Sequence, residues 1–297
     1  MNHEEFLKAR QTGIGGSDIA TLLGVNPYCT KLELYLQKRG ELEPNPDTSL
    51  TKAGRIMENV IASMVSERTN RKLRRINQTL RHPKYDFLIA HIDRDFVGHR
   101  KGLEIKNVSP RMGYLWGKDG ETDGVAEYYI PQAHHYMLVM DYPAFEVAAY
   151  FGGDDLRLYP IERDKEMDEI IIETAHDFWH KHVLAGVPPE PEYDHPKSLP
   201  LFKRLYPGTN GKEIEANEEI QHWAAVLQDA TKHKSNYAKV ENLAKAHILE
   251  FMKDAAILKL DNDKTFRRKQ VKKSGHFVEP TTYIDARFSA LRGQSDE

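Results

Sequence analysis

The stretch HIDRDFVGHRKGLEIKN, residues 91–107, decides the fold, because it contains the turn between two neighbouring strands. Alternating apolar residues predict one strand at 86–93 and the next at 101–107. The short connection returns the chain, so that Asp93 lies near Glu104. Two carboxylates that lie close together repel each other unless a positive charge lies between them. The stretch therefore predicts a cation site on the sheet.

Glu104 shares its strand face with Lys106, because side chains two residues apart in a strand point the same way. Carboxylate oxygens in an open arrangement suit Mg²⁺ or Mn²⁺ better than zinc. Lys106 is placed to orient or deprotonate a water for phosphodiester hydrolysis. Glu58, on a helix predicted over residues 50–68, completes the ligand set. A solvated hairpin with an ordinary ion pair explains the same pattern without any function.

The composition indicates a globular intracellular protein. The chain has 297 residues, of which 40% are hydrophobic, and this is enough for a substantial core. Cys29 is the only cysteine, so a disulfide framework and a four-cysteine metal site are excluded. No apolar run approaches the roughly 18 residues that a membrane span needs. We expect no contact with a membrane.

Charge is divided unevenly along the chain. Residues 1–111 carry 19 Lys and Arg against 13 Asp and Glu, whereas residues 112–192 carry 5 against 17. A basic first third beside an acidic middle suits a nucleic-acid channel with one wall that repels phosphate. A solvated acidic helix face explains the middle third equally well.

Proline density marks the domain boundaries that we predict. The main domain covers residues 1–190, and a linker follows at 191–212. Residues 213–297 form a C-terminal extension, with a helical segment to about residue 258 and then a basic β-hairpin.

The N-terminal motif RQTGIGGSDIATLLG combines a flexible turn with a helix start. Gly15 and Gly16 allow a close turn before Ser17, which we expect to cap a short helix. A helix N-terminus presents free N–H groups to an anion, and Arg10 adds a charged contact. An ordinary capped helix after a flexible loop is the alternative interpretation.

Together these motifs resemble the PD-(D/E)XK nuclease superfamily and, within it, the YqaJ-like viral recombinase or phage lambda exonuclease family. The resemblance runs over roughly residues 8–185 and rests on several motifs in the family's order. They are RQTGIGGSD with Arg10 and Ser17, GRIMENVI with Glu58, HIDRDF with Asp93, LEIKN with Glu104 and Lys106, and PQAHHYMLVM with Gln132. Two positions depart from the family: Ile92 and Arg94 flank Asp93 in place of proline and glycine, and His134 replaces a second polar residue that is often glutamine.

The resemblance implies an α/β fold with a central mixed β-sheet flanked by helices. It implies that Mg²⁺, for which Mn²⁺ substitutes, is bound by Asp93, Glu104, the carbonyl of Ile105 and, directly or through water, Glu58. Lys106 then positions the nucleophile, Gln132 supports the site, and Arg10 with Ser17 holds the 5′-phosphate of the degraded strand.

The implied activity is a 5′→3′ exonuclease that degrades one strand of linear double-stranded DNA. The resulting 3′ single strand is passed to a single-strand annealing recombinase. The family also implies a homotrimeric ring around the duplex, a bacteriophage context and the cytoplasm of a bacterial host cell. Two alternatives are an endonuclease of the restriction or repair type and a non-catalytic DNA-binding recombination adaptor.

Overall fold

The computed structural model describes residues 3–43, 48–122, 124–208, 213, 215–253, 255–259 and 265–267. The chain forms two compact units, residues 1–205 and 206–297. The segment that the sequence analysis assigned to a linker, 191–212, contains helix α7, Ser198–Leu205, at the end of the first unit. The division between the units therefore falls inside that segment and after a helix.

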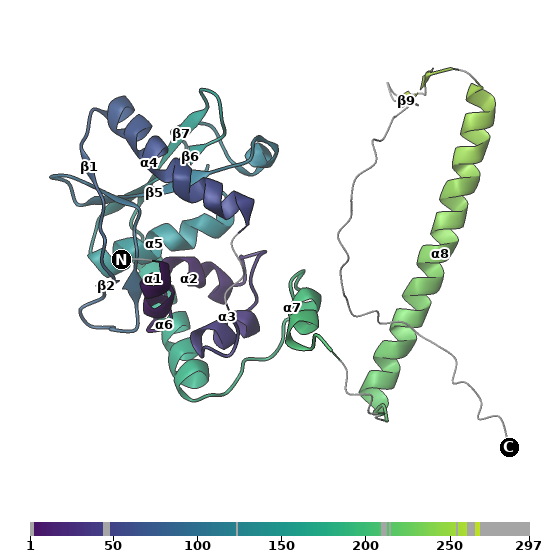
Figure 1. The fold of residues 1–297 in the computed structure, drawn as a ribbon, viewed down its shortest axis with the longest axis horizontal. Coiled ribbons are helices and arrows are strands. Elements are labelled where there is room, and N and C mark those ends of the chain that lie inside the picture. The colour runs from purple at the N-terminus through teal and green to yellow at the C-terminus, as the bar shows by residue number, and fades with distance from the viewer. Residues whose placement is uncertain are drawn as a thin grey trace. The chain divides into compact units, whose positions relative to one another are not determined.

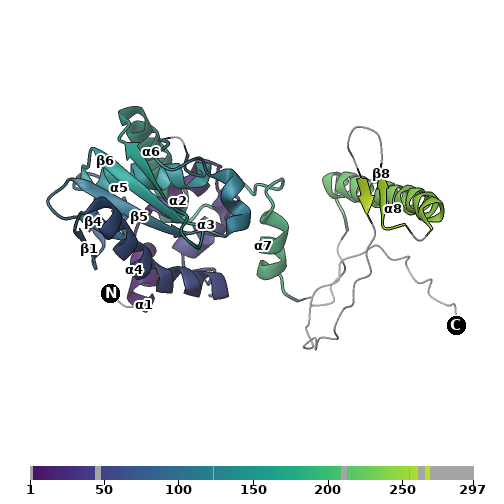
Figure 2. The ribbon, with the colours of Figure 1, turned by 90° about the horizontal axis from the view of Figure 1, so that it is seen from above.

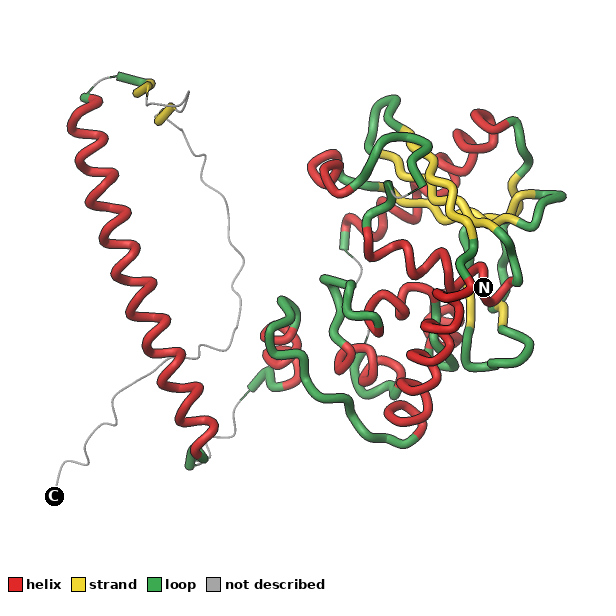
Figure 3. Tube along the Cα trace, turned by 180° about the vertical axis from the view of Figure 1, so that it is seen from behind, coloured by secondary structure: helices red, strands yellow, loops and turns green. Residues whose placement is uncertain are grey.

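The first unit combines helices with short strands (Figures 1 and 3). Its other helices are α1 His3–Arg10, α2 Gly16–Leu22, α3 Lys31–Lys38, α4 Ser49–Thr69, α5 Ile130–Met140 and α6 Lys165–Asp177, with short helical turns at Pro110–Leu115, Glu127–Tyr129 and Phe178–Leu184. Its strands are β1 Leu73–Arg74, β2 Leu80–Arg81, β3 Ile89–Ala90, β4 Arg94–Phe96, β5 Lys101–Asn107, β6 Ala144–Tyr150 and β7 Leu156–Glu162.

Five of these strands form a mixed sheet in the order β1-β4-β5-β6-β7. The central pair, β5 and β6, is parallel, and the connection between them contains α5. The other neighbouring pairs are antiparallel. The predicted α/β class with a central mixed sheet flanked by helices is confirmed.

Both faces of the sheet are covered (Figures 1 and 2). Helix α4 packs on one face, where Ile61 and Val65 meet Leu103 and Ile105 of β5. Helix α5 covers the other face and packs in turn against α2, with Met137 in this second core. The face that carries Glu104 and Lys106 therefore lies under α5. The sequence analysis placed Glu104 and Lys106 on one strand face but assigned no cover to that face.

The chain around Asp93 differs from the prediction of a continuous strand over 86–93. Only Ile89 and Ala90 are in a strand there, and they pair with β2. The antiparallel neighbour of β5 is β4, which begins one residue after Asp93. The Asp93 carboxylate accepts a hydrogen bond from the main-chain N–H of Ile105, so a side chain takes the place of a strand carbonyl at this point.

The start of α2 also differs from the prediction. The helix begins at Gly16, with Gly15 as its N-cap, so Ser17 is a helical residue and not the cap. The side chain of Asp18 accepts a hydrogen bond from the Gly15 N–H at 2.8 Å. A carboxylate at the third position of the helix thus satisfies the main-chain N–H of the N-cap residue, and Ser17 has no capping role.

The second unit contains α8, Glu218–Met252, and a short antiparallel pair of strands, β8 Ile257–Lys259 and β9 Thr265–Arg267. The helix agrees with the predicted helical segment. Most of the predicted basic hairpin lies outside the described residues. Among the helices that the structure describes, none is both long and apolar enough to cross a membrane.

Candidate active site

Strand β5 presents Glu104 and Lys106 to the space beneath α5. The Lys106 ammonium group donates a hydrogen bond to Glu104 Oε1 at 2.6 Å and another to Gln132 Oε1 at 3.2 Å. It also lies 4.2 Å from the centre of the Tyr129 ring. These contacts hold the amine in one place although the side chain is long and flexible.

Asp93 joins this pair from the adjacent chain segment. Its Oδ2 accepts a hydrogen bond from the main-chain N–H of Ile105 at 2.8 Å. Burial and the neighbouring Glu104 carboxylate raise the pKa of Asp93 well above its ordinary range, against the opposing effect of Lys106. The structure therefore brings together the two carboxylates that the opening stretch predicted, in an environment that resists a second negative charge.

Glu104 has one oxygen satisfied and one without a partner. Oε1 accepts hydrogen bonds from Lys106 and from Gln132, the latter at 2.8 Å. Oε2 is buried and has no hydrogen-bond partner among the described residues. A buried carboxylate oxygen without a donor is energetically costly. Together with the raised pKa of Asp93, this oxygen fits a hard divalent cation as the missing partner.

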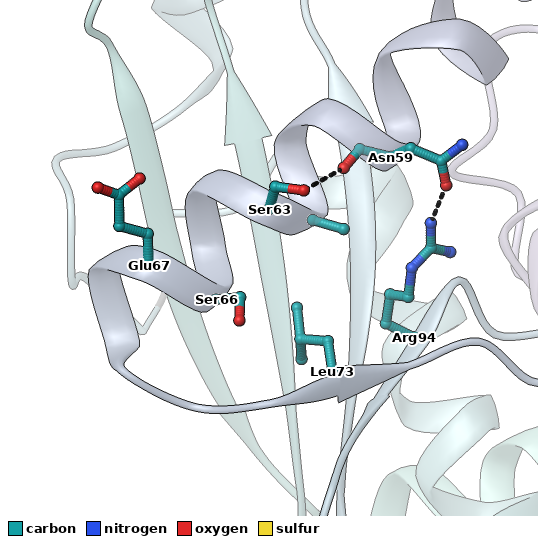
Figure 4. A pocket seen from close by; sticks show the side chains of 7 residues that line it. Asn59, Ser63, Ser66, Glu67, Leu73 and Arg94 are labelled. Carbon is teal, nitrogen blue, oxygen red and sulfur yellow. Dashed lines mark hydrogen bonds between the residues drawn. The ribbon is translucent and has the colours of Figure 1, made fainter.

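Glu58 reaches this region from α4, on the other side of the sheet, and its carboxylate is already paired. Its Oε1 accepts hydrogen bonds from Arg94 at 2.5 Å and from Arg75 at 3.1 Å. Arg94 also donates to Asn59 on the same helix (Figure 4) and to the main-chain oxygen of Asp93. Within the described residues, no group of three or more His, Cys, Asp or Glu side chains is arranged to hold a metal ion.

A polar cavity of about 520 Å³ opens beside Arg94 (Figure 4). Its lining residues are Asn59, Ala62, Ser63, Ser66, Glu67, Leu73 and Arg94. None of the predicted site residues is among them. The cavity therefore belongs to the α4 face of the sheet.

The structure brings Arg10 and Ser17 together as the N-terminal motif predicted. One guanidinium nitrogen of Arg10 donates to Ser17 Oγ at 3.0 Å and to Asp18 Oδ1 at 2.8 Å. Asp18 Oδ2 accepts in turn from the buried ammonium group of Lys38 at 2.5 Å. Burial alone would raise the pKa of Asp18, but Lys38 and Arg10 outweigh it and hold that pKa well below its ordinary range.

Helix α5 supplies Gln132, and next to it Tyr136. Gln132 Nε2 donates to Glu104 Oε1 and to the hydroxyl of Tyr136, both at 2.8 Å. His134 does not join them: burial lowers its pKa, and the charges that act on it are those of Asp164 and Asp168, at the start of α6. The helix therefore turns Gln132 toward the carboxylates and His134 away from them.

Four of the residues at the site were missed by the sequence analysis as contributors: Asp18, Lys38, Arg94 and Tyr136. Asp18 is visible in the GGSD motif, three residues after Gly15, where an acidic side chain caps a helix. Lys38 carries no local signal, because its partner Asp18 lies 20 residues away in the sequence. Tyr136 lies four residues after Gln132 on the same helix, and this spacing is the signal that could have found it. Arg94 was noted only as a departure from the family.

The amino-acid sequence is similar to known proteins. Residues 5–143 match the family described as the YqaJ-like viral recombinase domain. An uncharacterized protein, YqaJ of Bacillus subtilis (strain 168), is 33% identical over 262 residues, which are 86% of this chain and 80% of that protein.

Solved structures share the fold. An alkaline exonuclease from Laribacter hongkongensis superposes with a TM-score of 0.51 at 18% identity, over 67% of this chain and 99% of that one. The structure of LHK-Exo in complex with dAMP gives the same TM-score at 17% identity, over 68% of this chain and 97% of that one. At these identities the likeness to the two solved structures is one of fold. We conclude that this chain belongs to the YqaJ-like viral recombinase family.

Proposed function

We propose that the protein is a Mg²⁺-dependent exonuclease that degrades the 5′-ended strand of linear duplex DNA. The observation that carries this proposal is the partly buried group of Asp93, Glu104 and Lys106, in which the buried Glu104 Oε2 has no partner among the described residues. Two carboxylates and a fixed amine are the groups that phosphodiester hydrolysis with a divalent cation requires.

Asp93 and Glu104 would hold the cation, and the carbonyl of Ile105 is a third oxygen ligand in this proposal. Mg²⁺, or Mn²⁺ in its place, supplies Lewis-acid polarisation of the phosphate and a lower pKa for a coordinated water. The Glu58 carboxylate is hydrogen-bonded to Arg94 at 2.5 Å. Glu58 therefore contributes to the cation site only if its carboxylate leaves Arg94 or binds Arg94 and the cation at the same time.

Lys106 positions the attacking water, and Gln132 fixes the positions of the Lys106 and Glu104 side chains relative to each other. Gln132 can do both because its amide oxygen accepts from Lys106 while its amide nitrogen donates to Glu104. Rotation of this amide would break both contacts. The hydrolysis product would be a nucleoside 5′-monophosphate, and LHK-Exo, which shares the fold, has been crystallised with dAMP.

Arg10 and Ser17 are the proposed binding site for the terminal 5′-phosphate. Arg10 keeps guanidinium N–H groups for an anion, because among the described residues its hydrogen bonds to Ser17 and Asp18 use a single terminal nitrogen. The side chain of Arg10 is 36% exposed, so a DNA end can reach it.

The same proposal includes a homotrimeric ring around the duplex, in the cytoplasm of a bacterial host cell. A single-strand annealing recombinase is the proposed recipient of the 3′ single strand. The family description, which names viral recombinases, supports a place in DNA recombination.

The test is digestion of linear duplex DNA that is labelled at one 5′ or 3′ end and carries either a 5′-phosphate or a 5′-hydroxyl. Reactions contain Mg²⁺, Mn²⁺ or EDTA, with Lys106→Ala and a closed circular duplex as controls. We expect metal-dependent release of the 5′ label as a mononucleotide, faster with the 5′-phosphate and lost in Lys106→Ala.

Two other results would contradict the proposal. Cleavage of the closed circle would identify an endonuclease instead. Salt-sensitive DNA binding without any metal-dependent cleavage would identify a DNA-binding adaptor.

A further inference from the structure

Tyr136 lies between the two proposed binding sites. It is a residue of α5, its side chain is buried, and its hydroxyl accepts a hydrogen bond from Gln132 at 2.8 Å. Gln132 is the residue that contacts both Glu104 and Lys106. Tyr136 is therefore one hydrogen bond away from the side chain that positions the catalytic groups.

On its other side, Tyr136 lies against the helix that begins the Arg10–Ser17 site. A Cβ added at Gly16 would lie 2.6 Å from Cε1 of the Tyr136 ring and 3.0 Å from Cγ of Gln132. Such distances mean that the main chain of α2 itself rests on the ring, with no side chain between them. A displacement of the first turn of α2 must move the ring, because packed interiors leave little free space.

Electrostatic interactions also connect Tyr136 with both proposed sites. Tyr136 interacts with the Arg10 guanidinium and with the Glu104 carboxylate. Burial and then Glu104 raise the pKa of Tyr136 well above its ordinary range, so the hydroxyl stays protonated at neutral pH. The hydroxyl therefore acts as a fixed dipole between the two sites.

The Arg10–Ser17 site is tied to the same turn of α2. Arg10 binds Ser17 and Asp18, and Asp18 is anchored by Lys38, which also donates to the main-chain oxygens of Arg10 and Gly13. An anion that draws Arg10 toward itself therefore pulls on residues that precede and follow Gly16 in the chain. The close contact between Gly16 and Tyr136 would pass a displacement of this turn on to the ring.

We propose that Tyr136 is a positioning residue that couples occupation of the Arg10–Ser17 site by a terminal phosphate to the placement of Gln132. The proposal rests on the proposed exonuclease function and deepens it. It states that a 5′-phosphate raises the rate of the hydrolytic step and does not merely tighten DNA binding.

The experiment measures single-turnover hydrolysis at saturating protein on duplexes that differ only in a 5′-phosphate or a 5′-hydroxyl. Dissociation constants for the same two duplexes are measured by fluorescence anisotropy in EDTA. The variants are Tyr136→Phe, which keeps the ring and removes the hydroxyl, and Gly16→Ala, which forces the ring to shift. The control is Tyr159→Phe, because Tyr159 is equally buried and its hydroxyl donates to the Gly117 carbonyl oxygen, outside the site. Circular dichroism verifies that each variant folds.

We expect the wild-type protein to hydrolyse the 5′-phosphate duplex faster at saturation. Tyr136→Phe should reduce the ratio of the two rates by about fivefold, which corresponds to the loss of one hydrogen bond. It should leave the ratio of the two dissociation constants unchanged. Tyr159→Phe should change neither ratio, and Gly16→Ala, if folded, should act like Tyr136→Phe.

Two results would overturn the coupling and leave the exonuclease intact. The first is an unchanged rate ratio in Tyr136→Phe, including the case in which both rates fall equally. The second is a wild-type rate ratio of one at saturation with tighter binding of the 5′-phosphate duplex. Absence of metal-dependent degradation by the wild-type protein would instead overturn the proposed function, and the coupling with it.

Discussion

Two carboxylates, Asp93 and Glu104, share one buried space, and the positive charges around them decide what each can do. Lys106 stabilises Glu104 directly, whereas Asp93 has only a main-chain N–H and the more distant effect of Lys106. This arrangement leaves Asp93 as the group whose charge is most costly in the absence of a cation. A divalent cation removes that cost, and it also provides a partner for Glu104 Oε2.

In the metal-free protein, Asp93→Asn should increase the free energy of unfolding at pH 7.5. The folded-state pKa of Asp93 is raised, so the folded protein holds a proton that the unfolded chain loses at about pH 3.9. The free energy of unfolding therefore falls as the pH rises from the unfolded pKa to the folded pKa. Urea unfolding in EDTA at pH 5 and 7.5 tests this, with a smaller gain expected at pH 5.

The same variant separates the effect of the cation. Mg²⁺ or Ca²⁺ at 100 times its dissociation constant should stabilise the wild-type protein by about 2.7 kcal/mol. At the same concentration it should stabilise Asp93→Asn by much less. Equal stabilisation of the two proteins would show that the cation binds elsewhere.

Arg94 is expected to weaken cation binding, because it neutralises Glu58 and adds a positive charge beside Asp93. Arg94→Ala should therefore bind Ca²⁺ more tightly, by about tenfold if the change in electrostatic free energy is ~1.4 kcal/mol. Isothermal titration calorimetry with Ca²⁺ measures the affinity. Arg75→Ala is the matched control, because this second partner of Glu58 is half exposed and should have a smaller effect. Weaker binding in Arg94→Ala would show instead that Arg94 organises the ligands.

Asp18 holds the N-terminal motif together, because it binds Arg10, the Gly15 N–H and Lys38. Asp18→Asn leaves the Lys38 ammonium group buried, with a side-chain exposure of 3%, and without its countercharge. We expect a loss of about 3–5 kcal/mol in the free energy of unfolding, the usual cost of breaking a buried ion pair. Chemical denaturation measures it. The double variant Asp18→Asn, Lys38→Met should lose less than the sum of the two single variants, and strict additivity would contradict the pairing.

At the scale of elements, strand β5 can hold the site residues in place because helices cover both of its faces. Its apolar residues pack under α4, and its charged residues lie under α5, which supplies Gln132. Parallel pairing with β6 is typical of strands buried on both sides. The site is thus built on a central strand, where the main chain is held by hydrogen bonds on either side.

Two glycines distinguish a packed element from an open one. A methyl group on Gly102 in β5 would overlap the ring of Phe145, whereas a methyl group on Gly54 in α4 meets no atom within 4 Å. We expect Gly102→Ala to cost about 1–3 kcal/mol of stability. Gly54→Ala should instead stabilise the protein by about 0.5–1 kcal/mol, because alanine favours the helix. Thermal and urea unfolding measure the change in the free energy of unfolding for each variant. Equal changes in the two variants would contradict the packing described for β5.

At the scale of the whole molecule, every predicted site residue lies in the first compact unit. That unit, residues 1–205, contains the five-stranded sheet and both hydrophobic cores of the fold. The second unit, residues 206–297, contains α8 and the β8–β9 pair. The cation site should therefore form without the second unit.

A chain of residues 1–205 should unfold in a single cooperative transition and bind Ca²⁺ within about twofold of the full chain. Differential scanning calorimetry and calorimetric titration measure the two properties. The shorter chain with Asp93→Asn is the control for site-specific binding. A broad transition, or loss of Ca²⁺ binding in the shorter chain, would show that the second unit completes the fold or the site.

Local patterns carried much of what the sequence by itself determined. The alternation in β5 and the long helix with Glu58 each depend on neighbours within a few residues. Hydrogen bonds and side-chain direction at this range follow directly from strand and helix geometry. The approach of Asp93 to Glu104 also belongs here, because only the short strand β4 and one turn separate Asp93 from β5.

Only the tertiary structure decided which distant side chains meet. Glu58 is paired with Arg94, 36 residues away, instead of facing an open site, and Lys38 is paired with Asp18 in α2, 20 residues away. Tyr136 contacts Gly16 because α5 and α2 pack together, and no spacing in the sequence contains that information. Charge pairing and burial depend on how helices cover the two sheet faces, and that packing is a property of the folded chain as a whole.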